Sequence, residues 1–433
     1  MNRALNTSLP LSSPPGPRIS PSTANWTEEA GIATGSAAWW APDDTLRRFV
    51  AHLLLGEAGR LRQPTRAAPT MPWADDFTLD ERGLEVDSLD RLQLVAALGE
   101  ALNVAFSRRE AAQLAHAEFG AWLGAARSAL HNQASPAVGF RTSGSTGSAR
   151  RYDHTLAGLT EEAAFLSRLF AGHHRIVSAV PAHHIYGFIF TVLLPQALGH
   201  LSVIEVGSPA ELAANWAPGD LVIGYPEFWQ AVARQGQEAP PDLAGVTSTA
   251  PCPAEVAIAV AALGIPLTEI FGSTESAGLG WRQDPDDAFR RFPWWHSVSE
   301  EQWFRSLDGK RHVVSLPDHL VLSAGGRFQP SGRRDPVVQV GGINVSTAEV
   351  RDQLMAHPAV LDAAVRLMRP DEGHRLKAFV VPRPEVAPSE ALRAALMAWL
   401  TDRLPAAQRP RAITLGQQLP QGSMGKLADW DTA

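Results

Sequence analysis

The chain has little of several features that mark particular protein classes. Its single cysteine, Cys252, cannot form an internal disulfide, which fits a reducing compartment such as the cytoplasm. It has no apolar run of about eighteen residues, so we expect no membrane span. Positive charge is not in excess, since the formal net charge of the 433 residues is −7, and this argues against a nucleic-acid partner.

Composition and periodicity divide the chain into four expected parts. Residues 1–40 are rich in proline and serine and predict a disordered tail. Residues 41–132 repeat apolar residues at spacings of three and four, which predicts an all-α region. Residues 136–334 alternate short β-rich runs with helical stretches, which indicates an α/β fold of layered mixed sheets. Residues 335–433 read helix, strand, strand, helix, which predicts a small α+β domain.

The stretch FRTSGSTGSARR, Phe140–Arg151, combines two glycines, five hydroxyl side chains and three arginines. It could be a flexible Gly/Ser linker. A phosphate-binding loop is favoured, because β-compatible residues precede it, a helical pattern follows it, and small residues let backbone amides approach an anion. It is not the G-x-x-x-x-G-K-[ST] loop, since no lysine follows the second glycine.

This stretch and five later ones resemble motifs of the adenylate-forming superfamily, which includes acyl-CoA synthetases and aryl-acid AMP-ligases. They occur in the family's order over about two thirds of the chain, although Ala149-Arg150 replaces the family's Pro-Lys and Gln339 stands where lysine is common. The five later stretches are PAHHIYGFIF (181–190), STAPCP (248–253), IFGSTESAG (270–278), LPDHLVLSAGGRFQPSGRRDPVVQVGGINVSTAEV (316–350) and LPQGSMGKL (419–427).

The resemblance implies an AMP-forming acid–thiol ligase. ATP and a small carboxylic acid would form an acyl-adenylate, and a thiol of CoA or of a carrier protein's phosphopantetheine would then take the acyl group. A protein doing this must align two anions and stabilise charge at the α-phosphate. The altered loop leaves open a second function, that of a catalytically weak nucleotide-binding or carrier-docking protein.

The resemblance also implies roles for individual residues. Thr274 would contact the α-phosphate, Glu275 would hold Mg²⁺, and the Lys426 ammonium would bridge the acid and the α-phosphate. Asp335 would be the hinge of a C-terminal lid domain, and Gly341 and Gly342 would line the thiol tunnel. The remaining ATP-binding residues would be Thr142, Ser143, Gly144, Ser145, Thr146, Gly147, Arg150, Gly272, Ser273, Asp318 and Arg333.

The acid pocket is expected to be aromatic. Few cations stand among its candidate residues, which fits a small, hydroxybenzoate-like acid, and the stretch around them most resembles AMP-ligases of aryl-polyene pigment pathways. His184 could instead be a core histidine. The candidate walls are His183, His184, Tyr186, Phe188, Phe228, Ala250 and Phe271.

The helical region resembles an acyl carrier protein. Residues 83–111, GLEVDSLDRLQLVAALGEALNVAFSRREA, contain Asp-Ser-Leu-Asp before an amphipathic helix, as at a carrier's attachment serine. Ser88 is therefore the expected site for a phosphopantetheine arm. The alternative is that Asp87 or Ser88 merely caps a helix.

Overall fold

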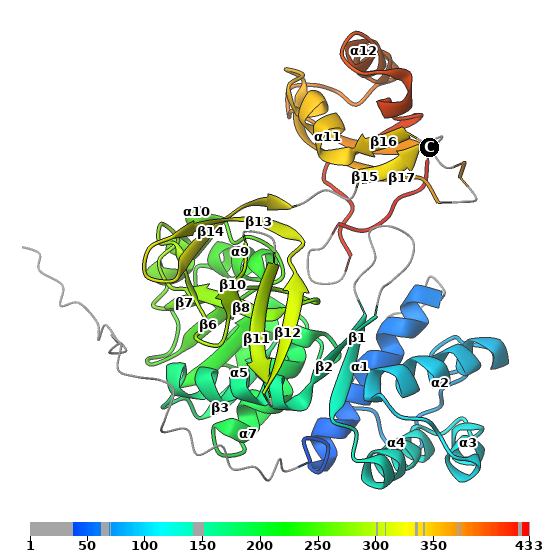
Figure 1. Cartoon of the computed structure of the whole chain (residues 1–433), viewed down its shortest axis with the longest axis vertical. Coiled ribbons are helices and arrows are strands. Elements are labelled where there is room, and N and C mark those ends of the chain that lie inside the picture. Colours follow the sequence, from blue (N-terminus) through cyan, green and yellow to red (C-terminus); the bar gives the residue numbers. More distant parts are fainter. Residues whose placement is uncertain are drawn as a thin grey trace, which may run out of the picture. The chain divides into compact units, whose positions relative to one another are not determined.

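The computed structural model describes most of the chain after residue 37 (Figure 1). Most of the predicted disordered tail therefore lies outside the described residues. No helix in the described part is both long and apolar enough to cross a bilayer. The described residues are 38–61, 69, 71–141, 151–299, 302–307, 309–333, 337–340, 343–369, 372–373, 375–422 and 427–432.

The segment predicted to be helical folds into four helices. Ser107 caps the third helix, because its hydroxyl accepts a hydrogen bond from the backbone N–H of Glu110 over 3.4 Å. The helices are α1 (Asp43–Leu61), α2 (Ser88–Leu102), α3 (Arg108–Leu114) and α4 (Phe119–Gln133).

Asp87, and not Ser88, caps helix α2. The Asp87 carboxylate accepts hydrogen bonds from the backbone N–H groups of Leu89 and Asp90, over 2.8 and 2.9 Å. The Asp90 carboxylate accepts one in return from the Asp87 N–H over 3.0 Å, which completes a capping box. Ser88 is the first helical residue and its side chain is exposed. Helix capping thus accounts for Asp87 but gives no role to the Ser88 hydroxyl.

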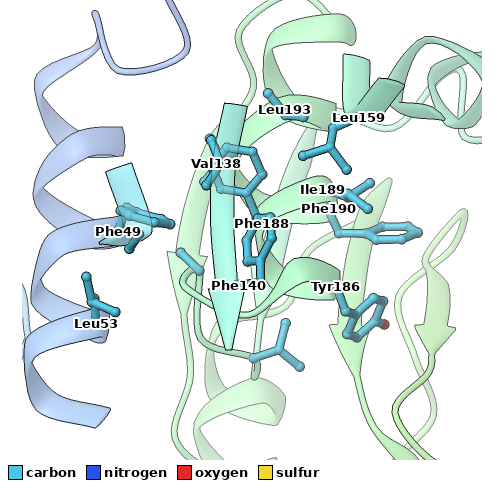
Figure 2. Packing of buried hydrophobic residues seen from close by; sticks show 14 of the residues in the cluster. Phe49, Leu53, Val138, Phe140, Leu159, Tyr186, Phe188, Ile189, Phe190 and Leu193 are labelled. Carbon is cyan, nitrogen blue, oxygen red and sulfur yellow. The ribbon is translucent and has the colours of Figure 1, made fainter. Parts of the chain in front are cut away.

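The four helices share a hydrophobic core with the α/β part that follows them. Phe49 and Leu53 of α1 lie in one cluster with Phe140 and Phe188 (Figure 2). The Phe188 ring is 5.6 Å from the Phe49 ring and 5.4 Å from the Phe140 ring, both edge-on. The helical region is therefore not a separate domain with its own core, because its apolar face is covered by the α/β part. Its likeness to a carrier protein stays a prediction.

The phosphate-loop candidate closes a two-stranded hairpin. Strands β1 (Ala137–Arg141) and β2 (Arg151–Thr155) are antiparallel, and Arg141 lies opposite Arg151 at the end where the loop connects them. Residues 142–150 of the loop lie outside the described residues.

A nine-stranded mixed sheet forms the middle of the fold, in the order β13-β14-β9-β8-β7-β6-β5-β3-β4. Strands β4, β3, β5, β6 and β7 are parallel, and the rest pair antiparallel. These strands are β3 (Arg175–Ser178), β4 (Ser202–Glu205), β5 (Asp220–Gly224), β6 (Ala244–Thr247), β7 (Leu267–Ser273), β8 (Ala277–Arg282), β9 (Phe289–Arg291), β13 (Asp318–Ser323) and β14 (Arg327–Arg333).

Helices alternate with the parallel strands, which confirms the predicted layered α/β class. β5 is buried along its whole length, and after Asp220 its sequence is a continuous apolar run rather than an alternating one. The helices are α5 (Leu156–Leu169), α6 (Ile185–Phe188), the π-helix η1 (Ile189–Leu193), α7 (Leu194–Ala197), α8 (Pro209–Asn215), α9 (Pro226–Gln235) and α10 (Ala254–Ala262). A second small sheet contains β10 (His296–Ser297), β11 (Gln302–Leu307) and β12 (Lys310–Ser315).

The C-terminal part has its own hydrophobic core, which confirms the predicted small α+β domain. Leu354, Val380 and Leu396 are fully buried in a cluster that includes no residue before 338. Its elements are β15 (Val337–Val340), β16 (Ile343–Ser346), α11 (Thr347–Met355), β17 (Val360–Leu367), β18 (Leu376–Pro382), α12 (Glu390–Thr401), the short helix η2 (Ala406–Gln408) and β19 (Ala412–Leu415).

Candidate active site

Three predicted motifs follow the carboxyl ends of neighbouring parallel strands. His184 comes after β3, Ala250 after β6 and Thr274 after β7. Parallel strands present these ends at one edge of the sheet, and open α/β sheets bind ligands there, where the strand order reverses. The reversal occurs at β3, which pairs with β4 on one side and β5 on the other. The topology therefore brings the motifs to one edge.

The turn between β7 and β8 presents Thr274 and Glu275. Both side chains are partly exposed, as a substrate-contacting pair must be. A Cβ at Gly272 would lie 2.2 Å from the carbonyl oxygen of Ala277, so only glycine fits where the two strands approach. The Ser276 hydroxyl accepts a hydrogen bond from the Ser273 N–H over 3.3 Å and closes the turn.

His154 joins this turn to the hairpin that carries the phosphate-loop candidate. Its Nε2 lies 2.7 Å from the backbone oxygen of Thr274. A carbonyl oxygen only accepts, so Nε2 carries the proton. Burial lowers the pKa of the His154 imidazole, which keeps the ring neutral. Because His154 lies on β2, three residues past the loop, it fixes the position of the loop's hairpin relative to Thr274.

A second buried group, Glu162 of α5, supports the other end of the same turn. Its carboxylate accepts a hydrogen bond from the Gly278 N–H over 3.2 Å, and its side chain is 1% exposed. Burial raises the pKa of the Glu162 carboxyl to about 7, although the charge of Arg305 and the Gly278 hydrogen bond oppose this. The carboxyl is therefore half-protonated near neutral pH.

This raised pKa predicts a pH-dependent stability. Between its ordinary pKa near 4.5 and about 7, Glu162 binds its proton more tightly in the folded protein, so the free energy of unfolding falls as pH rises. Glu162→Gln keeps an acceptor for the Gly278 N–H and should flatten this dependence. At about pH 8 we expect it to raise the free energy of unfolding by up to ~3 kcal/mol.

Denaturant unfolding at several pH values between about 5 and 8 measures this effect. Glu161→Gln is the matched control, because Glu161 is the adjacent residue but pairs with Arg305 in a partly exposed position. Equal pH slopes for the wild type and Glu162→Gln would exclude the assigned titration.

The turn after β6 is tied to β7. The Ser248 hydroxyl donates to the backbone oxygen of Ile270 over 2.9 Å, and the Cys252 N–H donates to the Glu269 carboxylate over 3.0 Å. These bonds hold Ala250, which is partly exposed, beside the strand that leads to Thr274. The turn after β6 and the Thr274–Glu275 turn thus form one connected framework.

The acid-pocket candidates divide into two groups. His184 precedes α6 and is partly exposed, and its ring lies 4.2 Å from that of His183. The Tyr186 hydroxyl donates to the backbone oxygen of Gly224 over 3.1 Å, which fixes α6 against the end of β5. Phe271 is partly buried, with its ring 5.4 Å from that of Phe289 on β9. These residues remain candidate walls.

Phe188 and Phe228 belong to hydrophobic cores rather than to a pocket. Phe188 is fully buried, with its ring against those of Phe49 on α1 and Phe140 on β1 (Figure 2), and Phe228 is 4% exposed with its ring 5.8 Å from that of Trp229. Aromatic neighbours already fill the space around both rings. We therefore assign both rings to the core.

Two nucleotide-binding candidates lie where an end of β13 pairs with an end of β14. Asp318 begins β13 and pairs in register with Arg333 at the end of β14. Gly272 and Ser273 end β7 in the same sheet. Several other predicted site residues lie outside the described residues: Thr142, Ser143, Gly144, Ser145, Thr146, Gly147, Arg150, Asp335, Gly341, Gly342 and Lys426.

The chain directly after Lys426 is held firmly to the C-terminal domain. Leu427 forms a bridge with Gln421, and its backbone oxygen accepts from the Arg366 guanidinium over 2.5 Å. Lys377 of β18 is fully buried and donates to the backbone oxygen of Trp430 over 2.5 Å. Residues 427–431 are therefore anchored on β17 and β18.

Two residues of this site, His154 and Glu162, were not anticipated from the sequence. His154 stands in the short strand RYDHT, where a lone histidine carries no motif. Glu162 stands in an amphipathic helix where a carboxylate reads as solvent-exposed. The only available signal was their position shortly after the phosphate-loop candidate.

Two family models match the chain. The model described as "AMP-binding enzyme" matches residues 78–293, which include α2 and α4 as well as the β7–β8 turn. The model described as "AMP-binding enzyme C-terminal domain" matches residues 349–426. Together they cover the sheet edge described above and most of the small C-terminal domain.

Curated relatives match almost the whole chain. The 4-coumarate--CoA ligase of Halorhodospira halophila is 34% identical and covers 89% of this chain and 98% of its own length. The 4-coumarate--CoA ligase of Cereibacter sphaeroides is 36% identical over 83% of this chain and 87% of its own. The ATP-bound structure of MatB from Rhodopseudomonas palustris is similar in fold, with a TM-score of 0.50, 17% identity and coverage of 78% of this chain and 76% of that one.

Proposed function

Because the chain belongs to the AMP-binding enzymes of the adenylate-forming superfamily, we propose that it activates a carboxylic acid with ATP and transfers the acyl group to CoA. The observation that carries this proposal is the sheet edge where the loops after β3, β6 and β7 meet. At this edge His154 ties the Thr274–Glu275 turn to the hairpin of the phosphate-loop candidate.

The proposed chemistry needs alignment more than covalent catalysis. The acid's carboxylate attacks the α-phosphorus of ATP, pyrophosphate leaves, and the CoA thiol then displaces AMP from the acyl-adenylate. We assign Thr274 to the α-phosphate, Asp318 to the ribose hydroxyls and the Lys426 ammonium to the charge between the two anions. Glu275 is partly exposed in its turn, so its carboxylate would be able to hold a Mg²⁺ ion. That ion would take most of its other ligands from phosphates and water, and it would neutralise charge on the phosphates.

We propose 4-coumarate, or a closely related aromatic acid, as the substrate. Relatives that are 34–36% identical over most of the chain carry the name 4-coumarate--CoA ligase. Tyr186, Phe271 and Ala250 supply apolar surface, and His184 supplies a polar ring, which suits a planar phenolic acid. A place in aryl-polyene pigment synthesis stays a prediction.

An acid panel tests this proposal. The purified chain is incubated with Mg-ATP, CoA and one acid at a time: 4-coumarate, cinnamate, 4-hydroxybenzoate, benzoate or acetate. Mass spectrometry should detect the CoA thioester of 4-coumarate at the highest kcat/KM. ATP binding without a thioester for any acid would favour the alternative of a catalytically weak nucleotide-binding protein.

The Ser88 prediction concerns the thiol acceptor. Ser88 is exposed at the first position of α2, next to the exposed Leu89, so a modifying enzyme could reach its hydroxyl. Incubation with CoA and a phosphopantetheinyl transferase should add one phosphopantetheine mass to the wild type and none to Ser88→Ala. An unchanged mass of the wild type would remove the carrier role and leave CoA as the acceptor.

His154 should matter for catalysis because it positions Thr274. His154→Leu removes the N–H donated to the Thr274 oxygen and should lower kcat for adenylate formation about 10-fold. His154→Gln can restore a donor and should recover part of the rate.

The matched control for this experiment is His173→Leu. His173 contacts the backbone oxygen of Gly219 over 3.2 Å, just before β3 begins, at the opposite edge of the sheet. Both substitutions should lower the melting temperature, but only the His154 change should lower kcat. Equal loss of kcat in both variants would mean that His154 acts through stability alone.

A further inference from the structure

A cavity of about 220 Å³ lies at the far end of the β13–β14 hairpin, away from the candidate active site. Asp318 begins β13, whereas the cavity meets that strand at Leu322 and Ser323. At about 3.3 Å per residue, these positions are roughly 13 to 17 Å apart along the strand. The remaining lining comes from the β13–β14 turn and from β9, β10, β11 and β14, through Arg291, Ser297, Trp303, Gly326 and Arg327.

The polar side chains around this cavity are hydrogen-bond donors. Arg291 and Arg327 contribute guanidinium groups, Ser297 and Ser323 contribute hydroxyls, and Trp303 contributes an indole N–H. Among the described residues, no carboxylate lines the cavity. The Arg327 guanidinium has a loose partner outside the lining, the carboxylate of Asp287 at 3.7 Å, which leaves it further donors.

One of these donors is buried and left unsatisfied by the described part of the protein. Trp303 is fully buried, and its Nε1–H has no hydrogen-bond partner there. A buried donor without a partner is costly, so a ligand or water is expected to accept from it. Arg291 is partly buried and forms no ion pair with the described residues, and burial lowers the pKa of its guanidinium.

The backbone holds Arg291 in place. Its N–H donates to the carbonyl oxygen of Gly326 over 2.9 Å, so β9 and the hairpin turn are joined beside the cavity. Gly326 has a φ of +70°, and an added Cβ would lie 3.7 Å from the Arg291 guanidinium. The guanidinium therefore packs directly against the turn.

We propose that this cavity binds a phosphate group. Two guanidinium groups, two hydroxyls and an indole N–H complement an oxyanion, which presents only acceptors. The phosphate could be a free inorganic ion or the 3′-phosphate of CoA. Only the second source rests on the proposed function.

Titration calorimetry on the full chain tests the proposal with inorganic phosphate, CoA and 3′-dephospho-CoA. Inorganic phosphate should bind the wild type saturably, and Arg291→Gln should weaken binding about 10-fold or more. Trp303→Phe removes only the N–H and should weaken it a few-fold, about 2- to 10-fold. Arg291→Lys, which keeps the charge, should retain more affinity than Arg291→Gln.

Arg290→Gln is the matched control. Arg290 is adjacent on β9 but lies over the Trp281 ring, with its guanidinium carbon 5.2 Å from the ring centre, and does not line the cavity. It should bind phosphate as the wild type does. No saturable phosphate binding, or equal weakening by Arg290→Gln and Arg291→Gln, would overturn the proposal.

The CoA arms identify the source. If Arg291→Gln weakens CoA but not 3′-dephospho-CoA, the bound phosphate belongs to CoA; if neither changes while inorganic phosphate weakens, the site takes the free ion. Acid-dependent pyrophosphate release is measured on the same samples. Phosphate binding without that release would contradict the proposed function and leave this inference intact.

Discussion

Replacing Lys426 by alanine is expected to lower the rate of acyl-adenylate formation about 100-fold or more, the cost typical of removing a donor that stabilises transition-state charge. Two anions, the acid and the α-phosphate, must approach each other, and the ammonium offsets their repulsion. The second half-reaction does not need this charge. Thioester formation from supplied acyl-adenylate and CoA should therefore be unchanged.

The chain offers a simple control, because it has only three lysines, Lys310, Lys377 and Lys426. Lys310 is exposed at the start of β12, so Lys310→Ala should leave both half-reactions intact. Rapid-quench measurement of the acyl-adenylate separates the two steps. Wild-type adenylation by Lys426→Ala would show that the assignment is wrong.

Lys377→Met is expected to destabilise the C-terminal domain by about 3–5 kcal/mol, the usual cost of removing one partner from a buried ion pair. Lys377 is fully buried, with its ammonium 2.8 Å from the Glu372 carboxylate and 2.9 Å from that of Asp429. Methionine fills the space but removes one of the two cations that pair with the buried Glu372 carboxylate, leaving only Arg369 at 3.1 Å. Because Lys377 also holds Trp430, the tail after Lys426 should loosen in the same variant.

Denaturant unfolding and hydrogen exchange of amides in the C-terminal domain both measure this loss of stability. Lys310→Met is the control for removal of an exposed lysine. The double variant Lys377→Met with Glu372→Gln should recover part of the stability, because a buried carboxylate that has lost one of its two cations is replaced by a neutral amide. A loss of stability below about 1 kcal/mol, as for a surface ion pair, would contradict a buried ion-pair cluster of Lys377, Glu372 and Asp429.

The same ion-pair cluster makes the stability of the C-terminal domain depend on pH. Burial alone would raise the pKa of the Asp429 carboxyl, but hydrogen bonds from Lys377 and Arg369 outweigh it and hold that pKa below its ordinary value of 3.8. The contribution of Asp429 to stability is therefore complete above that value and is lost as pH falls through the lowered pKa.

The sequence predicted the local structure where pattern and chemistry agree. Caps such as Ser107 and buried strands such as β5 depend on neighbouring residues, so they can be recognised without the fold. It did not specify which residues join the helical region to the core of the α/β part. The contact between Phe49 and Phe188 joins residues far apart in the chain, and no local pattern encodes it.

In the candidate site, too, the sequence reveals features set by neighbouring residues but not contacts between distant ones. Thr274 and Glu275 stand in a motif whose glycine, Gly272, is required by a close backbone approach, so a sequence can reveal them. His154 and Glu162 gain their roles only when β2 and α5 pack against the β7–β8 turn. Their environments, and therefore the shifted pKa values, exist only in the folded chain.

The most direct test of the central claim is acid-dependent exchange between pyrophosphate and ATP in the absence of CoA. If the chain forms an acyl-adenylate, labelled pyrophosphate should enter ATP when 4-coumarate and Mg²⁺ are present, and the exchange should stop without the acid. Two results would contradict the account: exchange at the same rate with and without the acid, or no exchange with any aromatic acid although ATP binds.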